Sequence, residues 1–285
     1  MTHFIDIHTH ILPFVDDGSK SMPMSEDMLS IAMDEGIETI VATPHFIPGM
    51  SNCKLEDRVS AFIKVREYVE RNNLPINVVL GNEIYLDDQT VEKLKNRECL
   101  PIGNTQYALL ELPMAEAPRK LEYMISCVLE AGFYPIIAHP ERYHWLMEEE
   151  EALDSLIHQG CLMQVNTGSI TGFYGKAVFH AVKNMFQNNK VHLVGTDAHS
   201  NRNRSPKMKE AYELIRQWAG QNYADQLFYK SAKGVLYNTS PALIIEEVSR
   251  CHANSKKEPK LFQFHGQEKN TSIPGFFMKL LIRKP

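Results

Sequence analysis

The sequence predicts an α/β fold in which a parallel sheet, covered by helices, closes into a barrel. Seven short apolar runs alternate with amphipathic stretches along almost the whole chain. The runs are nearly continuous in apolar residues, as in strands buried on both faces, which favours a parallel sheet. Their spacing is even and shows no central break, and a chain of 285 residues has the length of a single α/β barrel. Both features favour a closed barrel over an open sheet.

The elements follow one another in strand–helix order. The predicted strands cover residues 4–7, 39–42, 76–80, 108–112, 134–138, 162–165 and 192–194. The predicted helices cover residues 25–35, 55–72, 87–96, 118–131, 148–159, 176–188 and 206–219. Some helix ends are readable, since Ser25 suits an N-cap and Gly36 and Gly132 suit helix C-termini. Pro118 suits the first turn of its helix.

The chain changes character after Pro241, and we predict a barrel domain over residues 1–249 and a basic extension over 250–285. The extension has eight Lys or Arg residues against only Glu258 and Glu268 as acids. One interpretation is a solvated tail that packs loosely on the domain. The alternative is that the basic, apolar end at residues 276–284 touches an anionic membrane or a partner.

Composition excludes several classes of protein. A hydrophobic content of 44% and a net charge of −5 are typical of a globular domain rather than a disordered chain. The acidic balance argues against nucleic acid as the main partner. No run reaches the roughly 18 apolar residues of a membrane-spanning helix, and the start lacks a secretory signal. Five scattered cysteines without a Cys-x-x-Cys pair suit free thiols in a reducing cytoplasm.

The predicted strands end in residues that bind metals. These residues are His8 and His10 after the first strand, His45 after the second, Glu83 after the third, Glu111 at the fourth, His139 after the fifth, and Asp197 and His199 after the seventh. Only the sixth strand lacks such a ligand and offers Asn166 instead. Each residue alone has a structural explanation, as a satisfied polar side chain or a helix cap. Their coincidence at one end of the sheet, where parallel α/β folds assemble active sites, indicates a metal centre.

The residue types narrow the metal and the chemistry. Histidine and carboxylate without cysteine favour borderline-to-hard divalent ions such as Mn²⁺, Fe²⁺ or Zn²⁺. With the Asp16-Asp17 pair, the ligands outnumber the needs of one ion and suit two or three. Clustered ions about 3.5–4 Å apart are typical of phosphoester hydrolysis. Arg142 and Arg204, beyond the fifth and seventh strands, suit a bidentate phosphate clamp or, alternatively, surface salt bridges.

The chain closely resembles the polymerase and histidinol phosphatase (PHP) family, and within it the bacterial capsule-type protein-tyrosine phosphatases. The resemblance spans roughly residues 3–240. Its motifs are Ile5-Asp6-Ile7-His8-Thr9-His10-Ile11-Leu12-Pro13, Asp16-Asp17-Gly18, Ala42-Thr43-Pro44-His45, Gly81-Asn82-Glu83, His139-Pro140-Glu141-Arg142 and Asp197-Ala198-His199. Residues 250–285 lie outside it.

The resemblance implies a distorted, TIM-like seven-stranded βα barrel with three ions, usually manganese, with Fe, Zn, Co and Mg as alternatives. It implies that one ion is held by His8, His10, Glu83 and Asp197, a second by His45, Glu111 and His139, and a third near Asp17 and His199. It also implies that Asp17, His199, Arg142 and Arg204 act on the substrate phosphate. Arg202 is the rival of Arg204, because the stretch 201–204 aligns variably.

The expected activity is therefore hydrolysis of phosphotyrosine by metal-activated water, on a protein such as a bacterial tyrosine autokinase that controls capsule or exopolysaccharide synthesis. Cysteine chemistry is excluded, because no cysteine is followed six residues later by the arginine of a Cys-x₅-Arg loop. One alternative is a small phosphomonoesterase of the same family, similar to histidinol phosphatase. A second is a non-catalytic metal-binding regulator, whose expected sign, lost ligands, is not present. The amidohydrolases also open with His-x-His, but the bridging lysine they usually use has no counterpart that we can place here.

Overall fold

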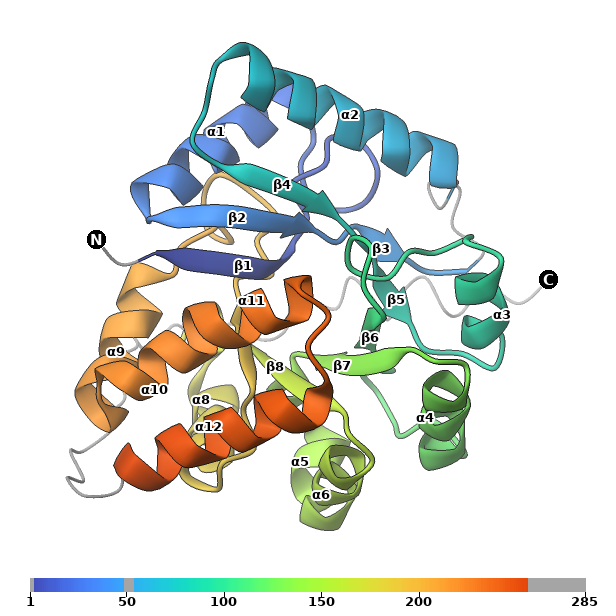
Figure 1. Cartoon of the computed structure of the whole chain (residues 1–285), viewed down its shortest axis with the longest axis vertical. Coiled ribbons are helices and arrows are strands. Elements are labelled where there is room, and N and C mark those ends of the chain that lie inside the picture. Colours follow the sequence, from blue (N-terminus) through green and yellow to red (C-terminus); the bar gives the residue numbers. More distant parts are fainter. Residues whose placement is uncertain (1–2, 49–53, 256–285) are drawn as a thin grey trace.

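The computed structural model describes residues 3–48 and 54–255, and its strands form two parallel sheets (Figure 1). The three-stranded sheet has the order β1-β2-β4, and the six-stranded sheet has the order β3-β5-β6-β7-β8-β9. The strands are β1 Phe4–Thr9, β2 Ile37–Ala42, β3 His45–Phe46, β4 Asn77–Leu80, β5 Glu83–Tyr85, β6 Tyr107–Glu111, β7 Tyr134–Ala138, β8 Leu162–Asn166 and β9 Leu193–Gly195. The predicted parallel α/β architecture is confirmed.

The predicted ring of seven strands is not confirmed, because the described residues form nine strands in two sheets, and two of these strands, β3 and β5, were not predicted. The second predicted strand ends at Ala42, and pairing resumes at His45 after Thr43 and Pro44. The proline has no N–H to donate to a sheet. The third predicted strand ends at Leu80 and resumes at Glu83. Each interruption therefore passes the chain from the smaller sheet to the larger one.

The two sheets also meet at their outer members, β1 and β9. The amide of His10 donates to the Ala198 carbonyl over 2.8 Å, and the amide of Asp197 donates to the His8 carbonyl over 2.8 Å. Thr9 and Ala198 form an isolated parallel bridge. The carboxyl ends of the first and last strands are therefore fixed against each other.

Helices lie outside the sheets and pack on their apolar faces (Figure 1). They are α1 Met22–Asp34, α2 Leu55–Arg71, α3 Thr90–Lys95, α4 Leu121–Glu130, η1 Pro140–Arg142, α5 His144–Glu148, α6 Glu150–His158, α7 Thr167–Ile170, α8 Lys176–Gln187, α9 Lys209–Ala219, α10 Gln221–Asp225, a π-helical turn at Gln226–Lys230, α11 Ser231–Leu236 and α12 Pro241–Ser255. The helix predicted over 148–159 is divided at Glu149 into α5 and α6.

Two predicted helix ends are wrong and two are confirmed. Ser25 does not cap α1, because the helix begins earlier and Ser21 accepts the capping bond from the amide of Met24. Ser25 instead lies buried in the first turns and donates to the Ile11 carbonyl over 2.6 Å. Pro118 precedes α4 rather than opening it. Gly36 and Gly132 have φ angles of 83° and 88°, the left-handed conformation that glycine favours after a helix.

The last helix, α12, crosses the predicted domain boundary at residues 249–250. Its side chains Ile244, Val248 and His252 are buried against the rest of the domain, so packed structure continues to the end of the described residues. The predicted membrane or partner contact at 276–284 lies outside them. Within residues 3–48 and 54–255, no helix is both long and apolar enough to cross a membrane.

Candidate metal centre

The predicted ligands converge at the carboxyl ends of the strands. His8 lies in β1, Glu83 opens β5 and Glu111 ends β6. The remaining donors follow strands directly or lie in the loops beyond them: His10, Asp17, His45, His139, Asp197 and His199. Eight of the nine residues fall into three overlapping groups whose ligand atoms lie within 4.8 Å of one another, and His139 contacts Glu83. Chain positions up to 191 residues apart are thus brought together.

The deepest group consists of His8, His10, Glu83 and Asp197, all at most 1% exposed. The Nε2 atoms of the two histidines are 3.2 Å apart, and each lies 3.2 Å from Oε2 of Glu83. Asp197 Oδ1 lies 3.6 Å from His8 Nε2 and 3.5 Å from His10 Nε2. Four donor atoms therefore surround one small space.

Two further groups share residues with the first. Asp17 Oδ1 lies 3.2 Å from His199 Nε2 and 3.5 Å from His45 Nε2. The other nitrogen of His45 lies 3.0 Å from Glu83 Oε2 and 3.6 Å from Glu111 Oε2. Asp17 is 48% exposed as a side chain, so this is where the cluster meets solvent.

The donors fit divalent cations. Among the described residues, His45 Nδ1, His139 Nδ1 and Glu83 Oε2 are buried without a hydrogen-bond partner. Buried polar atoms without partners are costly, and their concentration in one cluster fits a site that binds cations. Imidazole and carboxylate donors without thiolate suit Mn²⁺, Fe²⁺ or Zn²⁺.

A buried network orients two of the donors. The Nδ1 atom of His8 lies 2.8 Å from Gln164 Oε1, and the Gln164 amide donates to Asn166 Oδ1 over 2.9 Å. Asn166 in turn donates to Asp197 Oδ2 over 2.8 Å. This chain of amides fixes the His8 ring with Nε2 toward the cluster, as second-shell partners do. Gln164 was not among the residues expected from the sequence, where its only signal is a polar residue inside an apolar strand.

Asp16 and Asp17 have different roles, although they are neighbours. Asp16 Oδ2 lies 2.7 Å from His10 Nδ1 and accepts the amide of His45 over 3.0 Å. Burial alone would raise the pKa of Asp16, but the charge and hydrogen bond of His10 outweigh burial and lower it to about 2. Asp16 therefore orients His10 from behind, and Asp17 faces the cluster.

The ionisation of the donors follows from burial and from their mutual charges. Burial lowers the pKa of His139 to about 4, and burial with the charge of His10 lowers that of His199 to about 4. Burial, reinforced by the charge of Glu83, raises the pKa of Glu111 to about 7. For Glu83, burial favours the neutral acid, but the charges of His8 and His45 hold its pKa well below the usual range. Burial also favours the neutral rings of His8, His10 and His45, but nearby carboxylates outweigh it and raise their pKa values, that of His45 to about 9. Because imidazole binds metals in its neutral form, bound cations would displace these protons.

Arg142 and Arg204 both reach Asp197. Nη1 of Arg142 lies 3.2 Å from Asp197 Oδ2, and Nη2 of Arg204 lies 2.8 Å from the same oxygen. Their side chains are 23% and 29% exposed, so both guanidinium groups stand at the rim. Arg202 is exposed, and its amide donates to Ser200 Oγ. The structure thus brings Arg204, and not Arg202, to the cluster.

The backbone is strained where the donors leave the strands. His139 and Asp197 have φ angles of 35° and 52°, values that residues with a Cβ seldom adopt. The amide of Asp197 is held by the His8 carbonyl, and Asp197 itself is held by Asn166 and the arginines. Strain of this kind persists where surrounding contacts determine the conformation, and it concentrates at functional sites.

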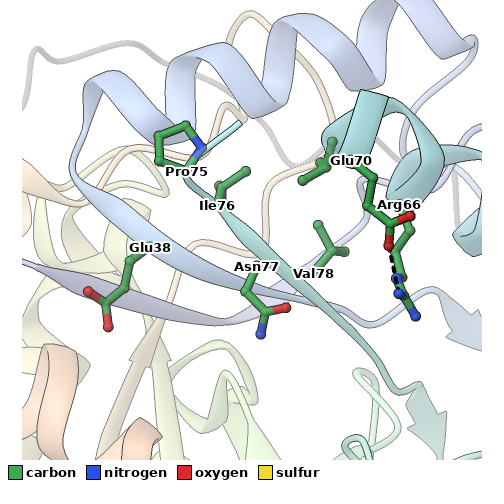
Figure 2. A pocket seen from close by; sticks show the side chains of 8 residues that line it. Glu38, Arg66, Glu70, Pro75, Ile76, Asn77 and Val78 are labelled. Atoms are coloured by element: carbon green, nitrogen blue, oxygen red, sulfur yellow. Dashed lines mark hydrogen bonds and ion pairs between the residues drawn. The ribbon is translucent and has the colours of Figure 1, made fainter. Parts of the chain in front are cut away.

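A surface hollow of about 570 Å³ lies elsewhere, beside α2 and β4 (Figure 2). Its eight lining residues are Glu38, Arg66, Val69, Glu70, Pro75, Ile76, Asn77 and Val78. Arg66 and Glu70 pair across one helical turn over 2.7 Å. None of the lining residues is a metal donor, so the hollow is separate from the cluster.

Residues 4–237 match the family described as capsular polysaccharide synthesis, CpsB/CapC. The chain belongs to this family. It is 32% identical over 237 residues to the tyrosine-protein phosphatase CpsB of Streptococcus pneumoniae, covering 81% of this chain and 98% of that protein. It is also 32% identical over 216 residues to the tyrosine-protein phosphatase YwqE of Bacillus subtilis, covering 76% of this chain and 85% of that one.

A solved structure supports the same relationship. YwqE from Bacillus subtilis and CpsB from Streptococcus pneumoniae have been crystallised and described as unique metal-dependent tyrosine phosphatases. A chain from that work matches this member of the CpsB/CapC family with a TM-score of 0.78 and 30% identity, covering 83% of this chain and 95% of that one. The resemblance inferred from the motifs is therefore confirmed.

Proposed function

We propose that this protein is a metal-dependent protein-tyrosine phosphatase that hydrolyses phosphotyrosine without a cysteine nucleophile. The observation that carries the proposal is the convergence of nine histidine and carboxylate residues with two arginines around Asp197. Its relatives CpsB and YwqE bear the name tyrosine-protein phosphatase. Within the described residues, Cys99 and Cys161 are buried, and burial raises the pKa of each thiol to about 12, which suits inert thiols.

The donors suit three ions, for which manganese is our choice. His8, His10, Glu83 and Asp197 would hold one ion. Glu83, Glu111 and His139 would hold a second, and Asp17, His45 and His199 a third. His45 belongs to two donor groups: its Nε2, 3.5 Å from Asp17, would serve the third ion, and its Nδ1, 3.0 Å from Glu83 and 3.6 Å from Glu111, reaches the second ion, to which the resemblance assigns it. Bound divalent ions would lower the pKa of water and neutralise phosphate charge.

The side chains at the rim would bind and orient the phosphate. Arg142 and Arg204 present guanidinium groups that match phosphate oxygens in a planar, bidentate manner. Asp197 contacts both arginines through one carboxylate oxygen, which would hold their guanidinium groups in place for a phosphate. The lowered pKa of His199 keeps its ring neutral at physiological pH, which favours metal binding over proton donation to the phenolate.

The physiological substrate we propose is a tyrosine-phosphorylated bacterial autokinase that controls capsule or exopolysaccharide synthesis. We also propose that the protein acts in the cytoplasm, because the four described cysteines are free. The two sheets, joined at β1 and β9, are compatible with the distorted seven-stranded barrel that the sequence resemblance implies.

The decisive experiment compares three phosphoesters at equal concentration: a phosphotyrosine peptide, the matching phosphoserine peptide and histidinol phosphate. We expect hydrolysis of the phosphotyrosine peptide with Mn²⁺ and its loss after chelation, with recovery when Mn²⁺ is restored. Activity that survives complete metal removal would contradict the proposal. Preference for histidinol phosphate would instead support a small phosphomonoesterase, and metal binding without hydrolysis would support a regulator.

A further inference from the structure

The turn between α7 and α8 borders the arginine pair. Its residue Tyr174 places its ring centroid 5.0 Å from the guanidinium carbon of Arg142, a cation–π distance. Nη1 of the same guanidinium lies 3.2 Å from Asp197 Oδ2. An aromatic face and a carboxylate therefore both contact Arg142, and these two independent contacts set its position.

Tyr174 is itself closely packed. A Cβ atom built on Gly168 would lie 2.8 Å from the Tyr174 ring, so the ring packs directly on glycine backbone, where other residues would clash. The ring of Phe173 meets that of Tyr174 at an interplanar angle of 82°, with centroids 5.1 Å apart, an edge-to-face pair. Phe173, Tyr174 and Arg142 thus form a continuous stack leading to the phosphate clamp.

Phe173 is presented to solvent on a firmly held backbone. Its side chain is 51% exposed, yet its amide donates to the Gly168 carbonyl over 2.8 Å. Gly172 and Gly175 on either side have φ angles of 80° and 92°, and the amide of Gly175 donates to the Gly172 carbonyl over 3.1 Å. A single exposed phenylalanine is ordinary on a protein surface, but this one lies in the stack that ends at Arg142.

We propose that Phe173 and Tyr174 give the enzyme its preference for aryl phosphates: Phe173 contacts the substrate ring, and Tyr174 is a positioning residue for Arg142. The inference rests on the proposed phosphatase function. In phosphotyrosine the ring is bonded directly to a phosphate oxygen. A phosphate bound by Arg142 therefore brings its ring to the neighbouring aromatic residues. A phosphoserine has no ring to make that contact.

The first test concerns Phe173 and uses the manganese-loaded protein. Phe173→Ala should raise KM for a phosphotyrosine peptide by about 3- to 10-fold, the range expected for loss of one aromatic pair. It should change KM for the matching phosphoserine peptide and the Ki of inorganic phosphate by less than twofold. Tyr237→Ala is the control, because Tyr237 is another exposed aromatic residue, at 75% exposure, and it follows α11 rather than lying in the turn between α7 and α8.

The second test separates positioning from packing at Tyr174. Tyr174→Phe keeps the ring over Arg142 and should retain the wild-type Ki of phosphate, whereas Tyr174→Leu should raise both this Ki and KM for either peptide. In an Arg142→Ala background, Tyr174→Leu should add no further effect on phosphate binding, because the residue it positions is gone. Full additivity of the two substitutions would overturn the positioning role.

The outcomes distinguish this inference from the proposed function. If the wild-type protein hydrolyses phosphotyrosine but Phe173→Ala leaves its KM unchanged, the inference alone is wrong. An equal change for phosphotyrosine peptide, phosphoserine peptide and free phosphate would also overturn it. If the wild-type protein hydrolyses no phosphotyrosine at all, the proposed function and this inference are both wrong.

Discussion

The two ends of the parallel strands bury opposite kinds of chemistry. At the amino ends and middles most buried residues are apolar, as with Phe4 and Ile40 at 1% and 0% exposure, and Asp6 and Gln164 are the exceptions inside β1 and β8. At the carboxyl ends, side chains such as His8, Glu83 and Asp197 are buried to the same extent. Equal burial therefore has opposite effects, since burying apolar surface stabilises the fold and burying ionisable groups opposes folding unless they are compensated.

This contrast places the stabilising apolar core at the amino ends and middles of the strands and the candidate functional site at their carboxyl ends. The carboxyl ends contain donor atoms without partners, like-charged carboxylates and strained backbone at His139 and Asp197. Bound cations would compensate the unpartnered donors and the like-charged carboxylates, whereas surrounding contacts hold the strained backbone. Substitutions at the carboxyl ends should thus change activity and metal binding, whereas substitutions at the amino ends should change stability alone.

The largest effect is expected from Asp197→Asn. The substitution keeps the size of the side chain but removes the charge that faces Arg142, Arg204 and His8. Loss of a metal ligand removes several kcal/mol of transition-state stabilisation, so kcat on a phosphotyrosine peptide should fall by roughly a thousandfold or more. Steady-state kinetics with Mn²⁺, together with the bound manganese content, measure the effect.

The matched control for this substitution lies in β2, away from the donors. Ile40→Val should lower the free energy of unfolding by about 0.5–1.5 kcal/mol and leave kcat unchanged. If Asp197→Asn kept kcat within tenfold of wild type, or if Ile40→Val lowered it as much, the separation between the strand ends would not hold.

The candidate donors other than Asp17 could be named from the sequence because they stand at or a few residues beyond the end of an apolar run, a position that needs no three-dimensional information; Asp17 was named from the Asp16-Asp17 pair and its motif. The sequence did not predict what depends on long-range packing. Gln164 stands inside a run and gains its role only from His8, which is 156 residues away. The choice between Arg202 and Arg204 depends on the path of an irregular loop, which no periodicity describes.

The division of two strands was also not anticipated. Pro44 was visible in the motif, but whether a chain bends and resumes pairing in another sheet depends on its neighbours. In this case Thr43 donates its amide to the Thr9 carbonyl and Asn82 donates its side chain to the Pro44 carbonyl. These contacts stabilise the interruption after the fold has formed. The helices beyond residue 219 lacked a following strand and so fell outside the strand–helix pattern.

The next effect in size is expected from Gln164→Leu, which tests whether the buried amides serve the metal centre. Leucine fills a similar volume but cannot accept from His8 or donate to Asn166. Removal of such a second-shell partner typically costs 10- to 100-fold in metal affinity, and we expect a loss of about this size in Mn²⁺ affinity. Competition with a chelating dye measures it.

Gln226→Leu provides the comparison for Gln164. Gln226 is 5% exposed and donates to Ser231 in the π-helical turn, away from the donors. Its loss should lower stability without changing the affinity for Mn²⁺. Equal losses of affinity in the two variants would show that Gln164 acts through general packing.

The pH dependence of stability should distinguish a structural histidine from the donors. His192 is 1% exposed and accepts the amide of Met163 over 3.0 Å. Burial lowers its pKa from 6.5 to about 4, so the unfolded chain takes up a proton first as pH falls. The stability that depends on neutral His192 is therefore fully present above pH 6.5 and is lost as pH falls from 6.5 to 4. Over this range the free energy of unfolding should fall by up to about 1.4 kcal/mol per pH unit.

His192→Gln should therefore flatten the fall of stability on the acid side, as measured by urea unfolding of the metal-free protein at each pH. Glu111 should change the stability with pH in the opposite direction. Its pKa is raised from 4.5 to about 7, so its contribution is lost as pH rises from 4.5 to 7, and Glu111→Gln should flatten that loss. An unchanged slope in either variant would show that the group titrates alike in the folded and unfolded states.

The smallest effect is expected from Phe14→Gly, in the loop that carries Asp16 and Asp17. Phe14 is 75% exposed and has a φ angle of 67°, so its ring gains little from packing while its backbone is strained. Glycine removes roughly 1–2 kcal/mol of left-handed strain but adds about 0.5–1 kcal/mol of unfolded-state entropy. The free energy of unfolding of the metal-free protein should therefore rise by about 0.5–1 kcal/mol.

Asn73→Gly is the control. Asn73 has a φ of 48°, and its substitution should raise the free energy of unfolding by less, because asparagine tolerates this conformation. A loss of stability in Phe14→Gly would mean that packing contacts of the ring outweigh the backbone strain. The loop at the carboxyl end of β1 would then stabilise the fold, contrary to the contrast drawn between the two strand ends.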